Sequence, residues 1–65
     1  MKNLVKVERA RLNLTQAQLA EKLEVSRQTI HAIEKSKFNP SVVLAIKMAK
    51  LFKISVEEIF NIDED

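Results

Sequence analysis

A short run in the middle of the chain carries side chains suited to reading the edges of nucleic-acid bases. Arg27 and Gln28 are adjacent. Arg can bond guanine O6 and N7 bidentately, and Gln suits adenine N6 and N7. Thr29 borders them, and His31 and Ala32 follow one helical turn later, where a small residue permits close approach. These residue types favour contact with base edges in a DNA major groove.

Catalytic and metal-binding chemistry has little support in the same sequence. The chain has one histidine, no cysteine and no glycine, and its carboxylates are not clustered at metal-ligand spacing. We therefore expect no enzyme activity, no metal and no cofactor. His31 is either an exposed helix residue or a contact to a base or phosphate, and helical position alone leaves both open.

Two short helices separated by a three-residue break must position these side chains. Thr15 is a good N-cap for the first helix, whose apolar stripe runs through Leu19. Ser26 can cap the second helix, in which Ile30 and Ile33 are spaced so that both point inward. With those two residues buried, the candidate base-reading residues point away from the core.

The flanking sequence extends this pattern over nearly the whole chain. The positions that carry it are Thr15, Gln16, Leu19, Ala20, Val25, Ser26, Ile30, Ile33, Glu34, Asn39, Pro40 and residues 56–60. Together they resemble the helix-turn-helix of phage repressors of the lambda, 434 and Cro type (the Xre family), in its small single-domain form. The resemblance implies a sequence-specific DNA-binding transcriptional regulator. It also matches Arg27, Gln28 and Ala32 to groove-facing positions of the recognition helix.

The sequence predicts an all-α, five-helix, lambda-repressor-like fold that forms a single domain over residues 1–65. Asn3 can cap a first helix that runs to about Leu12, Ser41 a central fourth helix and Ser55 a short fifth helix. The apolar residues expected to pack in these segments are Leu4, Val5, Leu12, Leu14, Val42, Leu44, Ala45, Met48, Ala49, Leu51, Phe52, Val56, Ile59 and Phe60.

The absence of glycine bears on how the helices end. Bends after helices often need a residue with positive φ, and glycine adopts that conformation without steric cost. We expect Asn13, Glu24, Lys53 and either Ser36 or Lys37 to serve at these bends, with some local strain at any that needs positive φ.

Contacts to DNA phosphates are expected at the starts of the two helices and after the recognition helix. The candidates are Thr15, Gln16, Ser26, Lys35, Lys37 and Asn39. Each lysine alone could equally be a solvated surface charge, but their shared side of the fold favours the collective interpretation. Phe38 could stack on a partner, although we expect it to fold back onto the core, as aromatic residues in small domains more often do.

Arg9 interrupts the apolar stripe of the first helix. In the resembled family an arginine at this place pairs with the glutamate that matches Glu34, and the pair ties the first helix to the recognition helix. The alternative is a surface arginine whose aliphatic stem lies along the apolar face. We favour the ion pair, because Glu34 is close to the buried side of its helix.

Charge is unevenly distributed along the chain. The formal net charge is +2, but residues 1–56 contain all eleven Lys and Arg residues and only four of the nine acidic residues. A basic body with an acidic tail suits a polyanionic partner such as double-stranded DNA, whereas the plain alternative is that these charges only solvate a small domain.

A homodimer is expected for two reasons. A 65-residue chain buries only a small core, and one recognition helix reads too few base pairs for useful discrimination. Two copies on a palindromic operator would place their recognition helices about 34 Å apart. We expect the interface at Ile59, Phe60 and Ile62, the alternative being that Ile59 and Phe60 cap the monomer core.

No signal peptide is recognisable, and the longest apolar run, residues 42–46, is far shorter than the ~20 residues of a membrane span. We expect a cytoplasmic protein without membrane contact and without an effector domain, most simply a repressor acting by occupancy. Two alternatives remain open: an antitoxin-type autoregulator that binds a toxin, and a protein-interaction module that has lost DNA binding.

Overall fold

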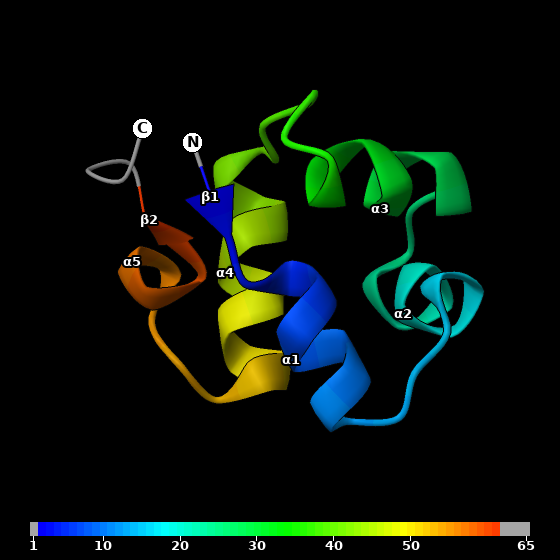
Figure 1. The fold of residues 1–65 in the computed structure, drawn as a ribbon, viewed down its shortest axis with the longest axis horizontal. Helices are drawn as coiled ribbons and strands as arrows, with labels where there is room; N and C mark the ends of the chain where they lie inside the picture. The colour runs from blue at the N-terminus through cyan, green and yellow to red at the C-terminus, as the bar shows by residue number, and fades with distance from the viewer. Residues whose placement is uncertain (1, 62–65) are drawn as a thin grey trace.

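Short helices make up most of the molecule, and a small ribbon pairs the two ends of its described part (Figure 1). The computed structural model describes residues 2–61. Their elements in chain order are β1 (Lys2–Asn3), α1 (Val5–Arg11), α2 (Gln16–Leu23), α3 (Arg27–Glu34), α4 (Val42–Phe52), α5 (Val56–Ile59) and β2 (Phe60–Asn61). The predicted all-α fold with five helices is confirmed, with the ribbon as an addition.

Four of these helices begin at a hydroxyl side chain, as the sequence predicts. Each hydroxyl oxygen accepts a hydrogen bond from the backbone N–H three residues further on, which satisfies a donor that the first helical turn would leave unpaired. The capping residues are Thr15, Ser26, Ser41 and Ser55.

The start of α1 differs from the prediction. Leu4, not Asn3, is the N-cap residue, and its side chain makes no cap bond. Asn3 instead lies in β1, where its Oδ1 accepts from the Val5 N–H at 3.2 Å and its Nδ2 donates to the Ile33 carbonyl at 2.8 Å. Pairing in the ribbon holds Asn3 extended, and Leu4 is consequently 41% exposed and not in the core.

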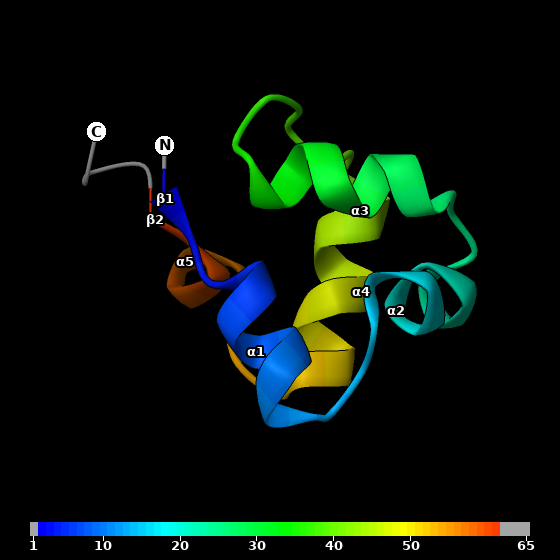
Figure 2. The same cartoon turned by 45° about the vertical axis from the view of Figure 1, so that its right-hand side comes forward.

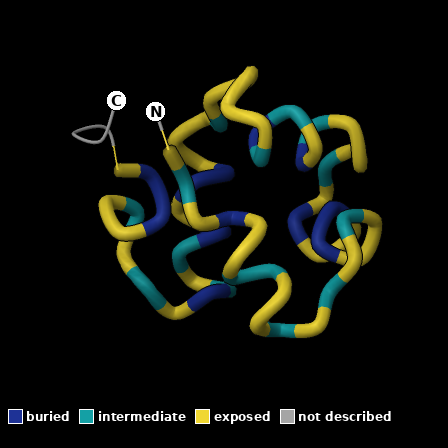
Figure 3. Tube along the Cα trace, in the orientation of Figure 1, coloured by how far each residue is buried: buried dark blue, intermediate teal, exposed yellow. Residues whose placement is uncertain are grey.

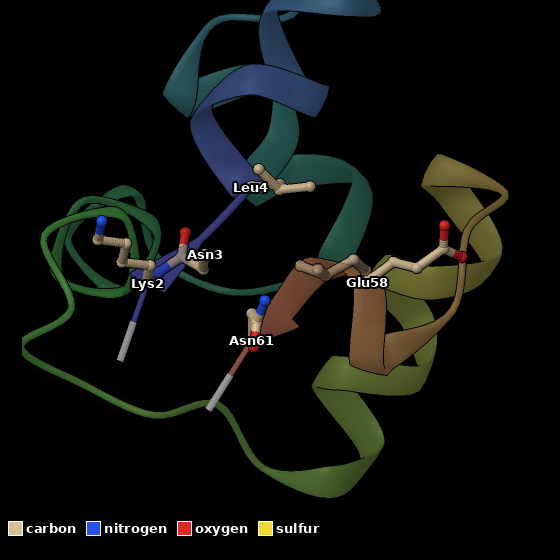
Figure 4. Close-up of a pocket in the computed structure, with 6 residues that line it drawn as sticks. Lys2, Asn3, Leu4, Glu58 and Asn61 are labelled. Atoms are coloured by element: carbon tan, nitrogen blue, oxygen red, sulfur yellow. The ribbon is translucent and has the colours of Figure 1, made fainter. Parts of the chain in front are cut away.

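The ribbon brings the two ends of the described chain side by side (Figures 1 and 2). The strands pair antiparallel, with Lys2 opposite Asn61 and Asn3 opposite Phe60. Figure 4 shows Lys2, Asn3 and Asn61 around the hollow beside it, whose volume is about 250 Å³. Strands of two residues are too short for an alternating pattern to predict them.

The first four helices are each followed by a residue in the left-handed region. Their φ angles are 57° for Asn13, 60° for Glu24, 57° for Ser36 and 61° for Lys53. These residues serve at the bends as predicted for this glycine-free chain, all four with positive φ, and at the third bend the residue is Ser36 and not Lys37.

One apolar cluster lies between the helices, and Figure 3 shows the buried segments turned toward the middle of the molecule. Its buried members are Val5, Leu19, Ala20, Leu23, Ile30, Ile33, Leu44, Ala45, Met48, Phe52, Ile59 and Phe60. Partly buried residues packed against it include Leu12, Leu14, Val25 and Val56.

Besides Leu4, two other residues expected in the core are exposed instead. Val42 is 75% exposed because it is the first residue of α4 and lies beside, not on, the stripe that faces the cluster. Phe38 is 51% exposed. The turn at Ser36 directs the following loop out over the surface, where Figure 1 shows it projecting beyond α3 and α4.

The burial of Ile59, at the end of α5, and of Phe60, in β2, bears on the expected dimer interface. Ile59 is fully buried and Phe60 is only 9% exposed, both within the core of one chain. The two residues therefore have almost no apolar surface left for a second copy, and they occupy the core positions of the alternative. Ile62, the third residue of that prediction, lies outside the described residues.

Candidate nucleic-acid interface

The turn between α2 and α3 fixes the angle at which α3 is presented (Figure 2). Glu24 ends α2 in the left-handed conformation, and the Val25 N–H then bonds the Ala20 carbonyl at 3.0 Å. Ile30 and Ile33, both fully buried, fix α3 on the core by its inner side. The opposite side of α3 is left without a packing role.

The outer side of α3 carries three exposed candidates for base contact. Arg27, Gln28 and His31 are exposed and together line a shallow hollow of about 180 Å³. Thr29 and Ala32 are half-buried at the edges of this side. Thr29 also lies 2.9 Å, hydroxyl to hydroxyl, from the Ser26 cap. The structure thus brings Arg27, Gln28 and His31 together on the free surface and leaves the other two less accessible.

An ion pair fastens α3 to α1. Arg9 Nε donates to Glu34 Oε2 at 2.7 Å and Nη2 donates to Oε1 at 3.3 Å, so the contact is bidentate. The remaining terminal nitrogen of Arg9 donates to the Leu14 carbonyl at 2.9 Å. The Glu34 side chain is only 4% exposed and that of Arg9 16%. This bidentate geometry fixes both the position and the rotation of α3.

Gln16 extends this contact to α2. Its Nε2 donates to Glu34 Oε1 at 3.0 Å and lies 3.4 Å from His31 Nδ1. Sequence reasoning assigned Gln16 to phosphate contact alone and missed this bridge. The signal was available, because the first residue of α2 faces the last turn of α3 in a helix-turn-helix. Glu34 therefore connects α1, α2 and α3.

The electrostatic surroundings of Glu34 keep it ionised. Burial tends to raise the pKa of its carboxyl group, but hydrogen bonds from Arg9 and Gln16 and the positive charges of Arg9 and Lys6 outweigh burial and hold the pKa below its usual value. A charged Glu34 is the form that holds both donors in place.

The candidate phosphate contacts are distributed around this network. Lys35, Lys37 and Asn39 are exposed at the end of α3 and in the loop that follows. The hydroxyl oxygens of Thr15 and Ser26 are exposed and already accept the cap bonds of α2 and α3.

Sequence reasoning also missed one basic residue. Lys6, exposed on α1, lines a hollow of about 340 Å³ with Arg9, Gln16, His31, Glu34 and Lys35. Its position one turn before Arg9 on α1 was the available signal.

Neither a cluster of metal ligands nor a membrane-spanning helix is found in the part of the chain that the structure describes. Among residues 2–61, no three His, Asp or Glu side chains gather closely enough to hold a metal ion. Every helix there is also too short or too polar to cross a membrane.

A family model described as helix-turn-helix matches residues 5–59, which spans all five helices of the structure. The chain belongs to this helix-turn-helix family. The family assignment makes the protein a DNA-binding regulator and not an enzyme, and it confirms the resemblance and the fold that the sequence predicts.

Relatives from distant organisms share the full length of the chain. An uncharacterized HTH-type transcriptional regulator of Methanocaldococcus jannaschii is 57% identical over 65 residues, which cover 100% of this chain and 98% of the relative. The uncharacterized HTH-type transcriptional regulator YgzD of Bacillus subtilis is 45% identical over 65 residues, which cover 100% of this chain and 98% of the length of YgzD. A third such protein, from Archaeoglobus fulgidus, is also 45% identical and is covered to 92%.

Proposed function

We propose that this helix-turn-helix protein binds DNA with sequence specificity by laying α3 in the major groove. The observation that carries the proposal is the division of α3 into a buried side, with Ile30 and Ile33, and a free side, with Arg27, Gln28 and His31. A guanidinium and a carboxamide on a free helix face are the groups that bond guanine and adenine edges bidentately. Arg27 and Gln28 would supply most of the specificity.

Contacts to the phosphates would orient α3 in the groove. Lys35, Lys37 and Asn39 lie just beyond the end of α3, and Lys6 adds a positive charge from α1. Such contacts supply affinity that falls with rising salt, but they carry little sequence information. Phe38 stands between Lys37 and Asn39, and its exposed ring offers apolar contact to a thymine methyl or a deoxyribose.

Within this proposal residues 1–65 act as a single DNA-binding unit, and the active form is a homodimer on a palindromic operator. One α3 contacts only a few base pairs, which does not discriminate an operator from a genome of competing sites. Occupancy of such an operator would repress transcription by excluding polymerase. The chain would work in the compartment that holds the DNA, which in cells without a nucleus is the cytoplasm.

Selection from a random-sequence DNA library tests the proposal. The wild-type protein should enrich one two-fold symmetric sequence, and the logarithm of its binding constant should fall linearly with the logarithm of salt concentration. The double variant Arg27→Ala, Gln28→Ala should keep the salt dependence and lose the enriched sequence. Failure of the wild-type protein to enrich any sequence at low salt would reject the proposal and favour a module that binds protein instead.

A further inference from the structure

His31 lines two hollows at the surface of α3. It lines the shallow hollow with Arg27 and Gln28, and it also lines the larger hollow that contains Gln16 and Glu34. In the larger hollow its Nδ1 lies 3.4 Å from Gln16 Nε2, which is within hydrogen-bond distance. A neutral imidazole donates through one ring nitrogen and accepts through the other. What His31 offers to a partner therefore depends on which nitrogen carries the hydrogen.

Glu34 fixes the direction of the Gln16 amide group. Burial raises the pKa of the Glu34 carboxyl, but the hydrogen bonds from Arg9 and Gln16 outweigh burial and hold this pKa below its usual value. The group is therefore a carboxylate, which can only accept hydrogen bonds. Gln16 must turn its NH2 group, and not its carbonyl oxygen, toward Glu34 Oε1, which lies 3.0 Å from Nε2. Gln16 Nε2 is thus a donor to each of its neighbours.

The second hydrogen of the Gln16 amide then determines the tautomer of His31. A primary amide nitrogen carries two hydrogens, and the one that does not bond Glu34 is directed at His31 Nδ1. Nδ1 accepts this bond only when it carries no hydrogen of its own, and a neutral imidazole then carries its hydrogen on Nε2. The two ring nitrogens point in widely different directions. The Nε2–H therefore points away from Gln16.

We propose that Gln16 is a positioning residue that holds His31 as a hydrogen-bond donor, through its Nε2–H, toward an acceptor atom of the DNA. The inference rests on the proposed function and deepens it, because it assigns the kind of atom that His31 contacts. The acceptors that DNA offers are purine N7, guanine O6 and thymine O4 in the major groove, and the phosphate oxygens. Cytosine is excluded, because its major-groove edge presents the N4 donor.

The surroundings of His31 support DNA as the source of this acceptor. Lys6 and Lys35 are exposed and line the larger hollow with His31, and their positive charges attract a phosphate backbone. Arg27 lies four residues before His31, so the two side chains lie one above the other on α3. Arg27 is also a donor without an acceptor atom. Together the two residues favour successive acceptors along the DNA, such as neighbouring guanines.

Single-atom changes in the selected operator test the contact. His31→Ala should bind the operator about fivefold more weakly than the wild type, the factor expected for one hydrogen bond. A base analogue that lacks one acceptor should weaken wild-type binding by the same factor at one position and leave His31→Ala binding unchanged there. The analogues are a purine with carbon in place of N7, a guanine without O6 and a thymine without O4. If the acceptor is a phosphate, an uncharged methylphosphonate at one position should have this effect instead.

A double-mutant comparison tests the positioning role of Gln16. Gln16→Met keeps nearly the same size and removes the N–H groups, so His31→Ala should cost less DNA affinity in this variant than in the wild type. This coupling isolates the pair, whatever contact Gln16 itself makes with DNA. Gln18→Met is the matched control, because it also removes a glutamine hydrogen bond from α2, the one that Oε1 accepts from the Thr15 N–H. In Gln18→Met the cost of His31→Ala should be unchanged.

Nitrogen chemical shifts of the imidazole test the tautomer without DNA. His31 is the one histidine of the chain, so its ring signals need no assignment. At pH 8, where imidazole is ordinarily neutral, the hydrogen should be on Nε2 in the wild type, and Gln16→Met should show both tautomers. The hydrogen on Nδ1 in the wild type, or the same tautomer ratio in both proteins, would overturn the inference.

The binding experiments separate this inference from the proposed function. An operator that His31→Ala binds as tightly as the wild type does would overturn the contact and leave the proposed function standing. A wild-type chain that selects no operator would reject the proposed function, and the DNA contact of His31 with it. The operator experiments use the wild type and a substitution of the exposed His31, so they do not depend on whether Gln16→Met folds.

Discussion

The inner and outer sides of α3 differ in their roles, because the inner side packs on the core and the outer side is the one proposed to recognise DNA. On the inner side, Ile30 and Ile33 are fully buried and Glu34 bonds Arg9 and Gln16. On the outer side, Arg27 and Gln28 are exposed with no role in packing. Substitutions on the inner side should therefore change the free energy of unfolding, and those on the outer side should change DNA affinity.

The largest effect should come from the ion pair on the inner side. Glu34→Ala leaves the guanidinium of Arg9 largely buried without its carboxylate, which should cost about 3–5 kcal/mol of unfolding free energy. Urea denaturation followed by circular dichroism measures the loss. The control is Lys47→Ala, which removes the more exposed Lys47–Glu24 pair at 3.4 Å and should cost less than about 1 kcal/mol. Equal losses in the two variants would contradict the structural role of Glu34.

Acid should remove part of the same interaction. The pKa of Glu34 is lower in the folded chain than in the unfolded chain, so the unfolded chain binds more protons as the pH falls. This contribution is complete above the unfolded pKa of about 4.3 and is lost as the pH falls through the folded pKa. Denaturation at pH 7 and pH 3 should show that Glu34→Gln loses less unfolding free energy between the two pH values than the wild type does. Equal losses of unfolding free energy in Glu34→Gln and the wild type would mean that Glu34 does not contribute to the pH dependence.

On the outer side, Arg27→Ala or Gln28→Ala should each reduce affinity for the selected operator by about 1–3 kcal/mol. Selectivity should relax at one base pair of each half-site, while the unfolding free energy stays within about 0.5 kcal/mol of the wild type. Repeating the DNA selection with each variant measures both effects. If a variant keeps the selectivity of the wild type, the residue that it replaces does not read a base.

Ser26 sharpens the comparison because it stands at the boundary between the two sides. Its hydroxyl caps α3, so Ser26→Ala should cost about 1 kcal/mol of unfolding free energy. Ser55→Ala removes the equivalent cap of α5 and should cost a similar amount. Only Ser26→Ala should also weaken DNA binding, since only Ser26 lies at the start of α3. Equal DNA affinities for the two variants would exclude a phosphate contact from Ser26.

Features set by local chemistry were predictable from the sequence. A hydroxyl residue before an apolar periodic segment is sufficient to predict a cap, and the four bends were identifiable because each helix must end between known apolar stripes. The inward position of Ile30 and Ile33 follows from helical periodicity alone. The side of α3 that is proposed to read bases is then what remains exposed.

Features that depend on the path of the chain in three dimensions were not predictable. Phe38 is exposed because the loop after α3 turns away from the core, and no local pattern encodes that direction. The ribbon joins Lys2 to Asn61, which lie at opposite ends of the described sequence. Its formation explains why Asn3 is not a cap and why Phe60 is held in the core.

The left-handed bends of this glycine-free chain also mark positions where the L-configuration of a residue has a steric cost. Lys53 has φ of 61° and ψ of 36°, close to the mirror image of the helical conformation that L-residues prefer. A D-residue favours this region for the steric reason that makes it cost an L-residue about 1–2 kcal/mol. D-lysine at position 53, introduced by chemical synthesis, would relieve that strain and keep the side chain, without the extra unfolded-state freedom that glycine would add. At this bend, the L-configuration of Lys53 carries a steric cost that its D-enantiomer would not.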